Sequence, residues 1–502
     1  MQMTAAAVIT NIPKSVSMSS LIPELATLAH AVLATTISLR VIMRRPAVGV
    51  ALAWMFLVAA VPGLGAVFYL LIGERRVGAK RARRIAAFRT DYERLAQAII
   101  DEGVTNVDWS RHRPEARGLD HLGVKLVGLP TVTGSTGHLL TDGEEILQSI
   151  ARDIDAAEKS VLMEFYIWNA GGLADEVLQA LIRARQRGVS CRVLIDAIGA
   201  RPWWKGDQPN QLRRAGVDVR PALPAGLWQT IFSRNDLRLH RKIVVIDGKV
   251  AWTGSMNLVD PRYFKQEANV GQWVDAMLRI EGCVVVPLAA VMIGDWMLET
   301  DETIEQIVND TGLSLVEPHG EGDAQVVPSG PVETDDGLLQ MLLTLVNAAR
   351  DELVLTTPYF VPDESLLRAI RGAAARGVAV HLILPEKVDS LLTRYASRSY
   401  YADLMDVGVK IHLYRKGLLH TKSVTADRCL SMFGTVNLDM RSLWLNYEVS
   451  LFVYGEAFGN HLHDLQQSYI DESDPLDMKE WSQRPYRERL LENALRLVSP
   501  VL

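Results

Sequence analysis

The sequence predicts an α/β fold made of two α/β sandwich repeats related by a pseudo-twofold axis, preceded by an N-terminal transmembrane helical hairpin. Three observations predict it. A short pattern of histidine, lysine and aspartate occurs twice, a strand-helix-strand pattern precedes each copy, and a long uncharged run lies near the N-terminus. With 502 residues, the chain is long enough for two or more packed units.

The repeated pattern is the most specific of these observations. The first copy has His240, Lys242 and Asp247, followed by a Gly-Ser-Met-Asn turn that contains Ser255 and Asn257. The second copy has His420, Lys422 and Asp427, followed by a Gly-Thr-Val-Asn turn that contains Thr435 and Asn437. Two copies at the same spacing indicate one active site assembled from two half-sites, with phosphate as the group that it handles.

A strand, an amphipathic helix and a second strand precede each copy. The apolar segments are 161–168 and 187–196 in the first half, and 353–360 and 376–384 in the second. Nearly continuous apolar strands joined by a helix are typical of a parallel or mixed sheet covered by helices. We therefore expect a first repeat over residues 119–315 and a second over 325–502.

The N-terminal part predicts a membrane segment over residues 1–75. The run from Gly49 to Gly73 has no charge and is long enough to cross a hydrocarbon core of about 30 Å. Pro62 and Gly63 in its middle are better tolerated in a membrane helix than in a soluble one. We expect helices over about 21–40 and 48–73, with an in-plane helix as the alternative for the first.

Basic residues after this segment indicate its orientation. They are Arg75, Arg76, Lys80, Arg81, Arg83 and Arg84, at the start of an expected helical linker over 76–118. Such a cluster favours a cytoplasmic location for the remainder of the chain, in a multi-pass protein of the bacterial inner membrane. It would also attract anionic lipid head groups.

The composition excludes some classes of function. Lys and Arg number 53 against 59 Asp and Glu, which argues against a nucleic-acid binder that works by general phosphate neutralisation. The three cysteines lack the paired Cys/His spacing of a zinc site, and no carboxylate cluster with metal-ligand spacing accompanies the motifs. We expect no cofactor and no metal. The oligomeric state is left open, a homo-oligomer included.

The motif residues suit phosphoryl transfer. Residues i and i+2 of a strand share a face, so each histidine should lie beside the lysine of its own motif. One imidazole can attack phosphorus while the other protonates the leaving alkoxide. The Ser, Thr and Asn side chains of the two turns would donate to phosphoryl oxygens. Asp247 and Asp427 are expected to orient or stabilise an imidazole.

These residues resemble the signature of the phospholipase D superfamily, and bacterial cardiolipin synthases in particular. Segments 251–264, 417–424 and 434–446 are similar to that family's motif regions, and Ala53–Gly65 is similar to the end of its membrane hairpin. The resemblance implies that the six His, Lys and Asp residues form the active site. It also implies that Glu267 and Glu448 tie the site together, the alternative for both being a surface or structural carboxylate.

The resemblance also implies the reaction. One phosphatidylglycerol would give its phosphatidyl group to a histidine, His240 by analogy, and release glycerol. A second phosphatidylglycerol would then give cardiolipin. A phospholipase D hydrolase, a phosphatidylserine synthase, a nuclease and a non-catalytic membrane scaffold are the alternatives. The aromatic segments 201–205 and 226–232 are expected either to dip into the membrane interface or to pack under the first motif.

Overall fold

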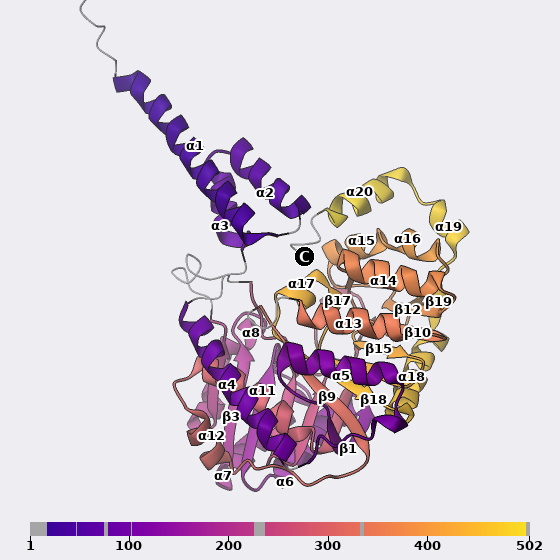
Figure 1. Cartoon of the computed structure of the whole chain (residues 1–502). Helices are drawn as coiled ribbons and strands as arrows, with labels where there is room; N and C mark the ends of the chain where they lie inside the picture. The colour runs from indigo at the N-terminus through magenta and orange to yellow at the C-terminus, as the bar shows by residue number, and fades with distance from the viewer. Residues whose placement is uncertain are drawn as a thin grey trace, which may run out of the picture. The chain divides into compact units, whose positions relative to one another are not determined.

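The computed structural model describes residues 18–46, 48–74, 79–101, 103–224, 236–331 and 336–497. The chain divides into a small N-terminal unit and a larger unit that starts at Val77. Figure 1 shows the helices and strands of both units.

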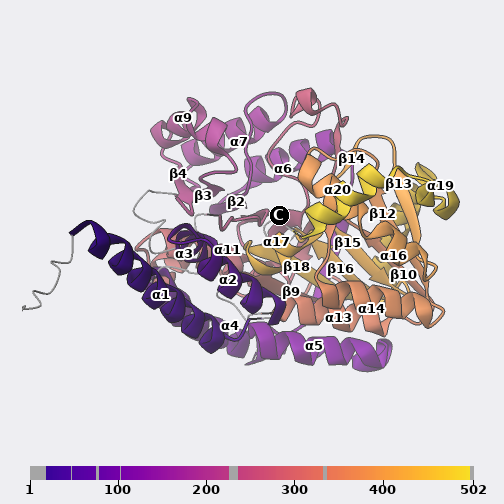
Figure 2. The ribbon, with the colours of Figure 1, turned by 90° about the horizontal axis from the view of Figure 1, so that it is seen from above.

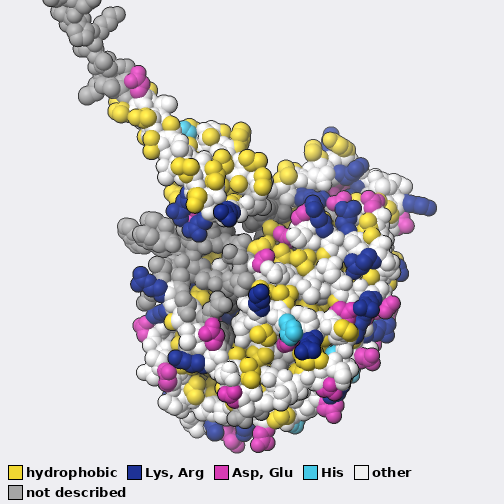
Figure 3. All heavy atoms as spheres, in the orientation of Figure 1, with side chains coloured by type: hydrophobic (Ala, Val, Ile, Leu, Met, Phe, Trp, Pro, Cys, Tyr) yellow, Lys and Arg dark blue, Asp and Glu magenta, His cyan; other side chains and the backbone are white. Residues whose placement is uncertain are grey.

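The N-terminal unit consists of α1 (Met18–Arg44), α2 (Val48–Ala60) and α3 (Leu64–Ile72). A small buried cluster holds the three helices together, formed by Ile37, Val41, Val58, Ala66 and Tyr69. Beyond this cluster, apolar side chains such as Leu25, Leu28 and Phe56 are exposed. Figure 3 shows hydrophobic side chains gathered over the surface of α1 and α2. Such an exposed apolar surface marks a contact with lipid or with another apolar surface.

The expectation of one continuous helix over 48–73 is wrong. The chain breaks between Ala60 and Leu64, where Pro62 lacks an N–H group and Gly63 has a left-handed φ of 72°. Neither α2 nor α3 alone has the roughly 20 residues that a straight crossing needs. The stretch Ile22–Arg44 of α1 is instead the one described helix that is long and apolar enough to cross a membrane.

The larger unit begins with α4 (Ala79–Asp101) and α5 (Pro114–Val127). Within it, the Arg81 guanidinium binds the Glu299 carboxylate at 2.5 Å and the Tyr447 hydroxyl at 3.1 Å. Arg84 binds Asp301. These two members of the predicted basic cluster therefore contact the protein itself. Arg75, Arg76 and the side chain of Lys80 lie outside the described residues.

Both repeats contribute to one sheet of 15 strands in the described chain. The first repeat supplies β1 (Val132–Leu140), β2 (Ser160–Phe165), β3 (Ser190–Asp196), β4 (Asp218–Ala222), β5 (Ile243–Ile246), β6 (Val250–Gly254) and β8 (Met277–Gly282). The second supplies β9 (Gly322–Ser329), β10 (Glu352–Thr356), β12 (Ala379–Pro385), β13 (Lys410–Tyr414), β15 (Ser423–Ala426), β16 (Leu430–Gly434), β18 (Glu448–Tyr454) and β19 (Ser473–Pro475).

The strand order shows the duplication directly. It reads β19-β13-β12-β10-β15-β16-β18-β9-β1-β8-β6-β5-β2-β3-β4. Outward from the central β9–β1 pair, the strands of the two repeats therefore occur in the same order on either side. Strands β2, β3 and β4 are parallel, as are β10, β12 and β13, and the strands between them are antiparallel. In Figure 2, β4 and β13 lie far apart, with β9 and β18 between them. The two expected sandwiches are thus one layered body with a shared sheet.

Helices cover both faces of this sheet. One face carries α6 (Gly143–Ala156) and α7 (Ala174–Gln186) in the first repeat, and α13 (Gly337–Ala348) and α14 (Glu364–Ala375) in the second. The other face carries α11 (Val285–Glu299) and α18 (Glu456–Asp471). Alternate residues of each central strand point into opposite layers, which is why these strands are apolar throughout.

The remaining helices lie in connections and at the C-terminal end. They are α8 (Arg201–Trp204), α9 (Gln208–Arg214), α12 (Ile304–Thr311), α15 (Leu391–Arg398), α16 (Tyr401–Met405), α17 (Met440–Trp444), α19 (Met478–Ser482) and α20 (Tyr486–Arg496).

Segment 201–205 packs inward. Trp203 is buried and stacks on Trp168 with ring centroids 4.7 Å apart. The Trp204 indole donates to the Asp196 carbonyl. Interfacial insertion of Trp203 is therefore contradicted, and packing under the first motif is correct for this segment. Segment 226–232, for which the same two alternatives were open, lies outside the described residues.

Candidate active site

Each motif histidine lies just before a central strand and crosses towards the other repeat. His240 precedes β5, and its N–H donates to the Tyr447 carbonyl at 2.9 Å. His420 precedes β15, and its N–H donates to the Val274 carbonyl at 2.7 Å. The short strand β14 (Leu418–Leu419) continues this contact by pairing with β7 (Trp273–Val274) of the first repeat. Backbone pairing thus brings both motifs to one seam.

Each histidine pairs with a carboxylate of the other repeat, across the seam. The Nδ1 atom of His240 lies 2.8 Å from Oε2 of Glu448, and the Nδ1 atom of His420 lies 2.7 Å from Oδ1 of Asp275. All four side chains are buried. A carboxylate on Nδ1 fixes the tautomer and leaves Nε2 as the reactive nitrogen.

Asp275 was missed in the sequence, and Glu267 was wrongly offered as the counterpart of Glu448. Glu267 is exposed on the short helix η2 (Gln266–Ala268) and lines the pocket that contains both histidines, but the Nδ1 atoms pair with Glu448 and Asp275 instead. Strand register identifies the true counterpart, because Gly254 pairs with Met277 and Gly434 pairs with Ser450. Each acid stands two residues before that partner. The loop between motif and acid is longer in the first repeat, so equal spacing pointed to the wrong carboxylate.

Asp247 and Asp427 contact neither imidazole, contrary to expectation. The Asp247 carboxylate accepts the backbone N–H groups of residues 158–160 at 2.7–2.9 Å. Asp427 accepts those of residues 350–352 at 2.8–2.9 Å, and it also binds Arg113. Both aspartates occupy left-handed turns, with φ of 52° and 51°. They therefore fasten the start of β2 or β10 to the end of the motif strand.

The motif lysines are fully buried beside the histidines. The Lys242 ammonium donates to the His240 carbonyl at 2.6 Å, and the Lys422 ammonium donates to the His420 carbonyl at 2.5 Å. The Lys242 ammonium also lies 5.7 Å from the centroid of the Tyr166 ring, which makes an edge contact with His240. Each ammonium is thereby fixed close to its imidazole.

The turn hydroxyls act on the carboxylates. Ser255 donates to Asp275 and Thr435 donates to Glu448, both at 2.6 Å. The same hydroxyls accept the N–H groups of Ala276 and Val449. The expected role of these two hydroxyls as phosphoryl donors is therefore replaced by a role in orienting the acids.

The turn asparagines face the reaction space instead. Asn257 and Asn437 both line the pocket that contains the histidines. The Asn257 carbonyl oxygen accepts the Ile167 N–H at 3.1 Å, which directs its amide group. Asn446 donates to the second oxygen of Glu448 at 3.1 Å and so completes the shell around that acid.

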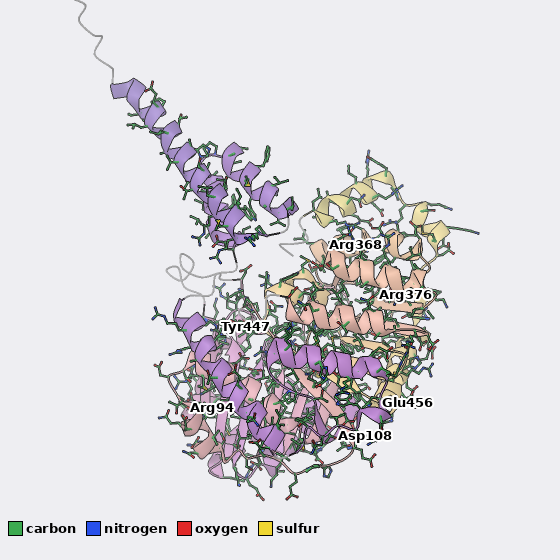
Figure 4. The ribbon with its side chains drawn as sticks, in the orientation of Figure 1. Arg94, Asp108, Arg368, Arg376, Tyr447 and Glu456 are labelled. Atoms are coloured by element: carbon green, nitrogen blue, oxygen red, sulfur yellow. The ribbon has the colours of Figure 1, made fainter. Side chains whose placement is uncertain are left out.

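The residue between His240 and Lys242 points to the opposite side of the strand. Arg241 is buried, pairs with Asp295 at 2.5 Å, and donates to the backbone carbonyl of Glu448 at 2.8 Å. Its guanidinium also lies 5.7 Å from the centroid of the Tyr447 ring (Tyr447 is labelled in Figure 4). The first motif therefore also holds the backbone of the strand that carries the acid for His240.

A single pocket of about 830 Å³ contains both histidines. Its remaining polar and aromatic lining includes Tyr166, Arg238, Tyr263, Lys265, Trp273, Tyr359, Asp389, Asp439 and Arg441. The structure thus brings together the two histidines and the two asparagines at one pocket, with the lysines and the acids behind them.

Burial controls the protonation of this site. It lowers the pKa of His240 and of His420 to about 4, against the opposing effect of Glu448 and Asp275. Burial also lowers the pKa of Lys242 to about 8 and that of Lys422 well below its usual value. The histidines and lysines hold the pKa values of Glu448 and Asp275 below their usual range, although burial opposes this.

This arrangement presents two oriented neutral imidazoles to one volume. A neutral imidazole is a nucleophile towards phosphorus, and an anion bound between the two rings would favour protonation of the other. Two ammonium groups and two amide groups provide positive charge and donors for an anionic centre. The site is thus suited to displacement at a phosphodiester.

Two protein families and several known proteins match most of this chain. Residues 150–276 and 342–469 match the family described as cardiolipin synthase, PLD-like domain, and residues 32–74 match a phospholipase D-nuclease N-terminal family. Cardiolipin synthase A of Erwinia tasmaniensis is 42% identical over 467 residues, which are 93% of this chain and 96% of the relative. Cardiolipin synthase A of Edwardsiella ictaluri is 42% identical over 487 residues, 96% of this chain and 99% of that one.

A solved structure supports the fold. Phosphatidylserine synthase of Haemophilus influenzae superposes with a TM-score of 0.58 at 15% identity, over 77% of this chain and all of that chain. At this level of identity, the likeness concerns the fold alone.

Proposed function

Because this chain belongs to the cardiolipin synthase family of phospholipase D-like enzymes, we propose that its paired-histidine pocket transfers a phosphatidyl group between two phosphatidylglycerol molecules. The protein is a phosphatidyltransferase that acts on anionic phospholipids at a membrane. The pairing of each histidine with a carboxylate of the other repeat is the observation that supports this mechanism most strongly.

In the first step, Nε2 of His240 attacks the phosphorus of one phosphatidylglycerol. A P–N bond forms, the P–O bond to glycerol breaks, and the His420 imidazolium gives its proton to the departing alkoxide. Asp275 favours that imidazolium, and the bound phosphodiester adds a second negative charge beside it. Glycerol leaves with the proton, and a phosphatidyl-histidine remains.

In the second step, a primary hydroxyl of another phosphatidylglycerol gives its proton to His420. Its oxygen attacks phosphorus, the P–N bond breaks, and cardiolipin forms while His420 is again protonated. One phosphodiester replaces another, so the overall free energy is close to zero and the reaction is reversible. Lys242, Lys422, Asn257 and Asn437 would stabilise the charge on the phosphoryl oxygens in both steps.

We also propose how the chain lies in the membrane. The helix α1 would cross the bilayer, and the uncharged stretch through α2 and α3 would cross back as a broken helix, since breaks are tolerated where neighbouring helices cover them. The larger unit would then lie in the cytoplasm. A membrane-impermeant maleimide should label both Ser15→Cys and Glu364→Cys in inverted vesicles and neither in right-side-out vesicles. Labelling on opposite sides would refute the hairpin.

The proposed reaction has a direct assay. The full-length protein is reconstituted in vesicles that contain phosphatidylglycerol as the only reactive lipid, and cardiolipin, glycerol and phosphatidic acid are measured. Cardiolipin and glycerol should appear in equal amounts. Phosphatidic acid without cardiolipin would indicate a hydrolase and refute the transfer reaction.

A further inference from the structure

The pocket is not symmetric, although the repeats around it are. Lys265 lines the pocket eight residues after Asn257 of the first turn. It lies in the loop between the first turn and Asp275, which is longer than the corresponding loop between the second turn and Glu448.

Lys265 stands close to His420. Its ammonium lies 5.3 Å from the centroid of the Trp273 ring, and that ring lies 4.3 Å from the His420 ring. The Lys265 ammonium pairs with Asp389 of the second repeat at 3.0 Å, and the charge of His420 also acts on Asp389. One aromatic ring thus separates this cation from the proposed acid and base of the reaction.

The position of Lys265 is firmly held. Its backbone has a left-handed φ of 49°, which is uncommon for a residue other than glycine and is concentrated at functional sites. Tyr359 donates to the other oxygen of Asp389 at 2.7 Å, and the Asp389 side chain is only 8% exposed. The Lys265 side chain is 40% exposed, and its ammonium has three donors, of which Asp389 takes one. The ammonium can therefore bind an anion without leaving Asp389.

We propose that Lys265, positioned by Asp389, binds the phosphodiester of the acceptor phosphatidylglycerol. This assignment rests on the proposed function and adds a second phosphate subsite to it. The attacking hydroxyl must approach the base, and in phosphatidylglycerol the acceptor's own phosphodiester is on the same glycerol unit. A cation beside His420 would meet that phosphate. Water and free glycerol have no phosphate to place there, so the subsite favours the lipid acceptor over both.

Two other cations of the pocket lie on the His240 side. Arg238 stands two residues before His240, so an extended chain directs both to one face. Arg441, Arg238 and the Tyr166 ring are close enough to influence one another, and Tyr166 contacts His240. The carboxylates of Asp196 and Asp236 also act on Arg238. A cation on this side would bind the phosphate group that is transferred to His240, and its effect would be the same for every acceptor.

The test compares two reactions of the same phosphatidyl-histidine. Reconstituted full-length protein receives phosphatidylglycerol vesicles and labelled free glycerol. Formation of cardiolipin uses an acceptor with a phosphate, and incorporation of label into phosphatidylglycerol uses an acceptor without one. The readout is the ratio of the two rates, in which effects on the shared first step cancel.

Lys265→Gln should lower this ratio about 10- to 100-fold, the effect expected for one charge-assisted contact. Lys265→Arg should keep most of the ratio, and Asp389→Asn should lower it by a smaller factor because the ammonium loses its anchor. Arg441→Gln should slow both reactions in parallel and leave the ratio unchanged. Arg368→Gln is the matched surface control on α14, where the side chain is 75% exposed (Figure 4).

The outcomes separate the two proposals. If the unaltered protein catalyses neither reaction, the proposed function fails. If it catalyses both and Lys265→Gln leaves the ratio unchanged while the protein stays folded, only the subsite is refuted. A ratio that falls in Arg441→Gln and not in Lys265→Gln would place the acceptor phosphate on the His240 side and overturn the assignment to Lys265.

Discussion

The Nδ1 atom of His240 lies 2.8 Å from the Glu448 carboxylate, although 208 positions separate the two residues in the chain. The reciprocal contact joins His420 to Asp275 at 2.7 Å. The carboxylate of each repeat therefore orients the histidine of the other repeat.

Glu448→Gln and Asp275→Asn should each reduce the rate of cardiolipin formation about 10²- to 10⁴-fold, because each removes the charge that orients and stabilises one imidazolium. Steady-state rates in phosphatidylglycerol vesicles measure this loss. Glu267→Gln is the comparison variant, since Glu267 lines the same pocket and was the counterpart suggested by sequence spacing, whereas the histidines pair with Glu448 and Asp275. A loss in Glu267→Gln equal to that in Asp275→Asn would refute the assignment of the acids.

The nucleophile can be identified by trapping. With a radiolabelled phosphatidyl donor that has a good leaving group, His420→Ala should accumulate label on the protein, because His240 can still attack and the base for the second step is missing. His240→Ala should retain no label. Acid-labile, base-stable label would identify a phosphohistidine. Label retained on His240→Ala would make His420 the nucleophile.

Asp247 and Asp427 should matter for stability more than for chemistry. Replacing either by Ala removes the acceptor of three backbone N–H groups and a side chain that suits a left-handed turn, at a cost of about 1–3 kcal/mol in the free energy of unfolding. Asn should cost less because it retains one oxygen and tolerates that turn. Thermal unfolding and the rate per folded molecule are measured together. A large loss of rate at an unchanged midpoint would show a direct catalytic role.

Acid should destabilise the folded protein between about pH 6.5 and 4. Burial lowers the pKa of both histidines from 6.5 to about 4, so the unfolded chain binds their protons first. Their contribution to stability is fully present above pH 6.5 and is lost as the pH falls towards 4, by up to about 3 kcal/mol per histidine. The unfolding midpoint of the detergent-solubilised protein should fall over this range. The double variant His240→Gln and His420→Gln should lose less, and an equal acid response would contradict this origin.

Much of the fold was predictable because its signals are local. The apolar segments 161–168 and 353–360 overlap the observed strands β2 and β10, each of which begins one residue earlier, and the helices after them show amphipathic spacing. The fusion of both repeats into one sheet was not predictable, since it depends on β1 and β9, which pair across about 190 positions. The helix break after Ala60 was not predicted, because Pro62 and Gly63 were taken as residues that a membrane helix tolerates, whereas they end the helix locally.

The site was predictable in its composition and not in its connections. Strand geometry places His240 beside Lys242 and His420 beside Lys422, because residues i and i+2 share a face. The partners of the imidazoles come from the opposite repeat, and a short motif carries no signal for such distant pairing. Sequence proximity therefore favoured Asp247 and Asp427 as orienting acids, whereas Asp275 and Glu448 occupy that position.

The pairing of each histidine with an acid of the other repeat has a consequence for the newly made chain. A ribosome that has released the first repeat has produced His240 and Asp275, but Glu448 and His420 are still to be translated. The first repeat alone can therefore hold neither complete pair, even if it folds early. Glu448 reaches His240 only once β18, which begins at Glu448, has formed beside β9. We therefore expect the first repeat alone to be inactive towards lipid.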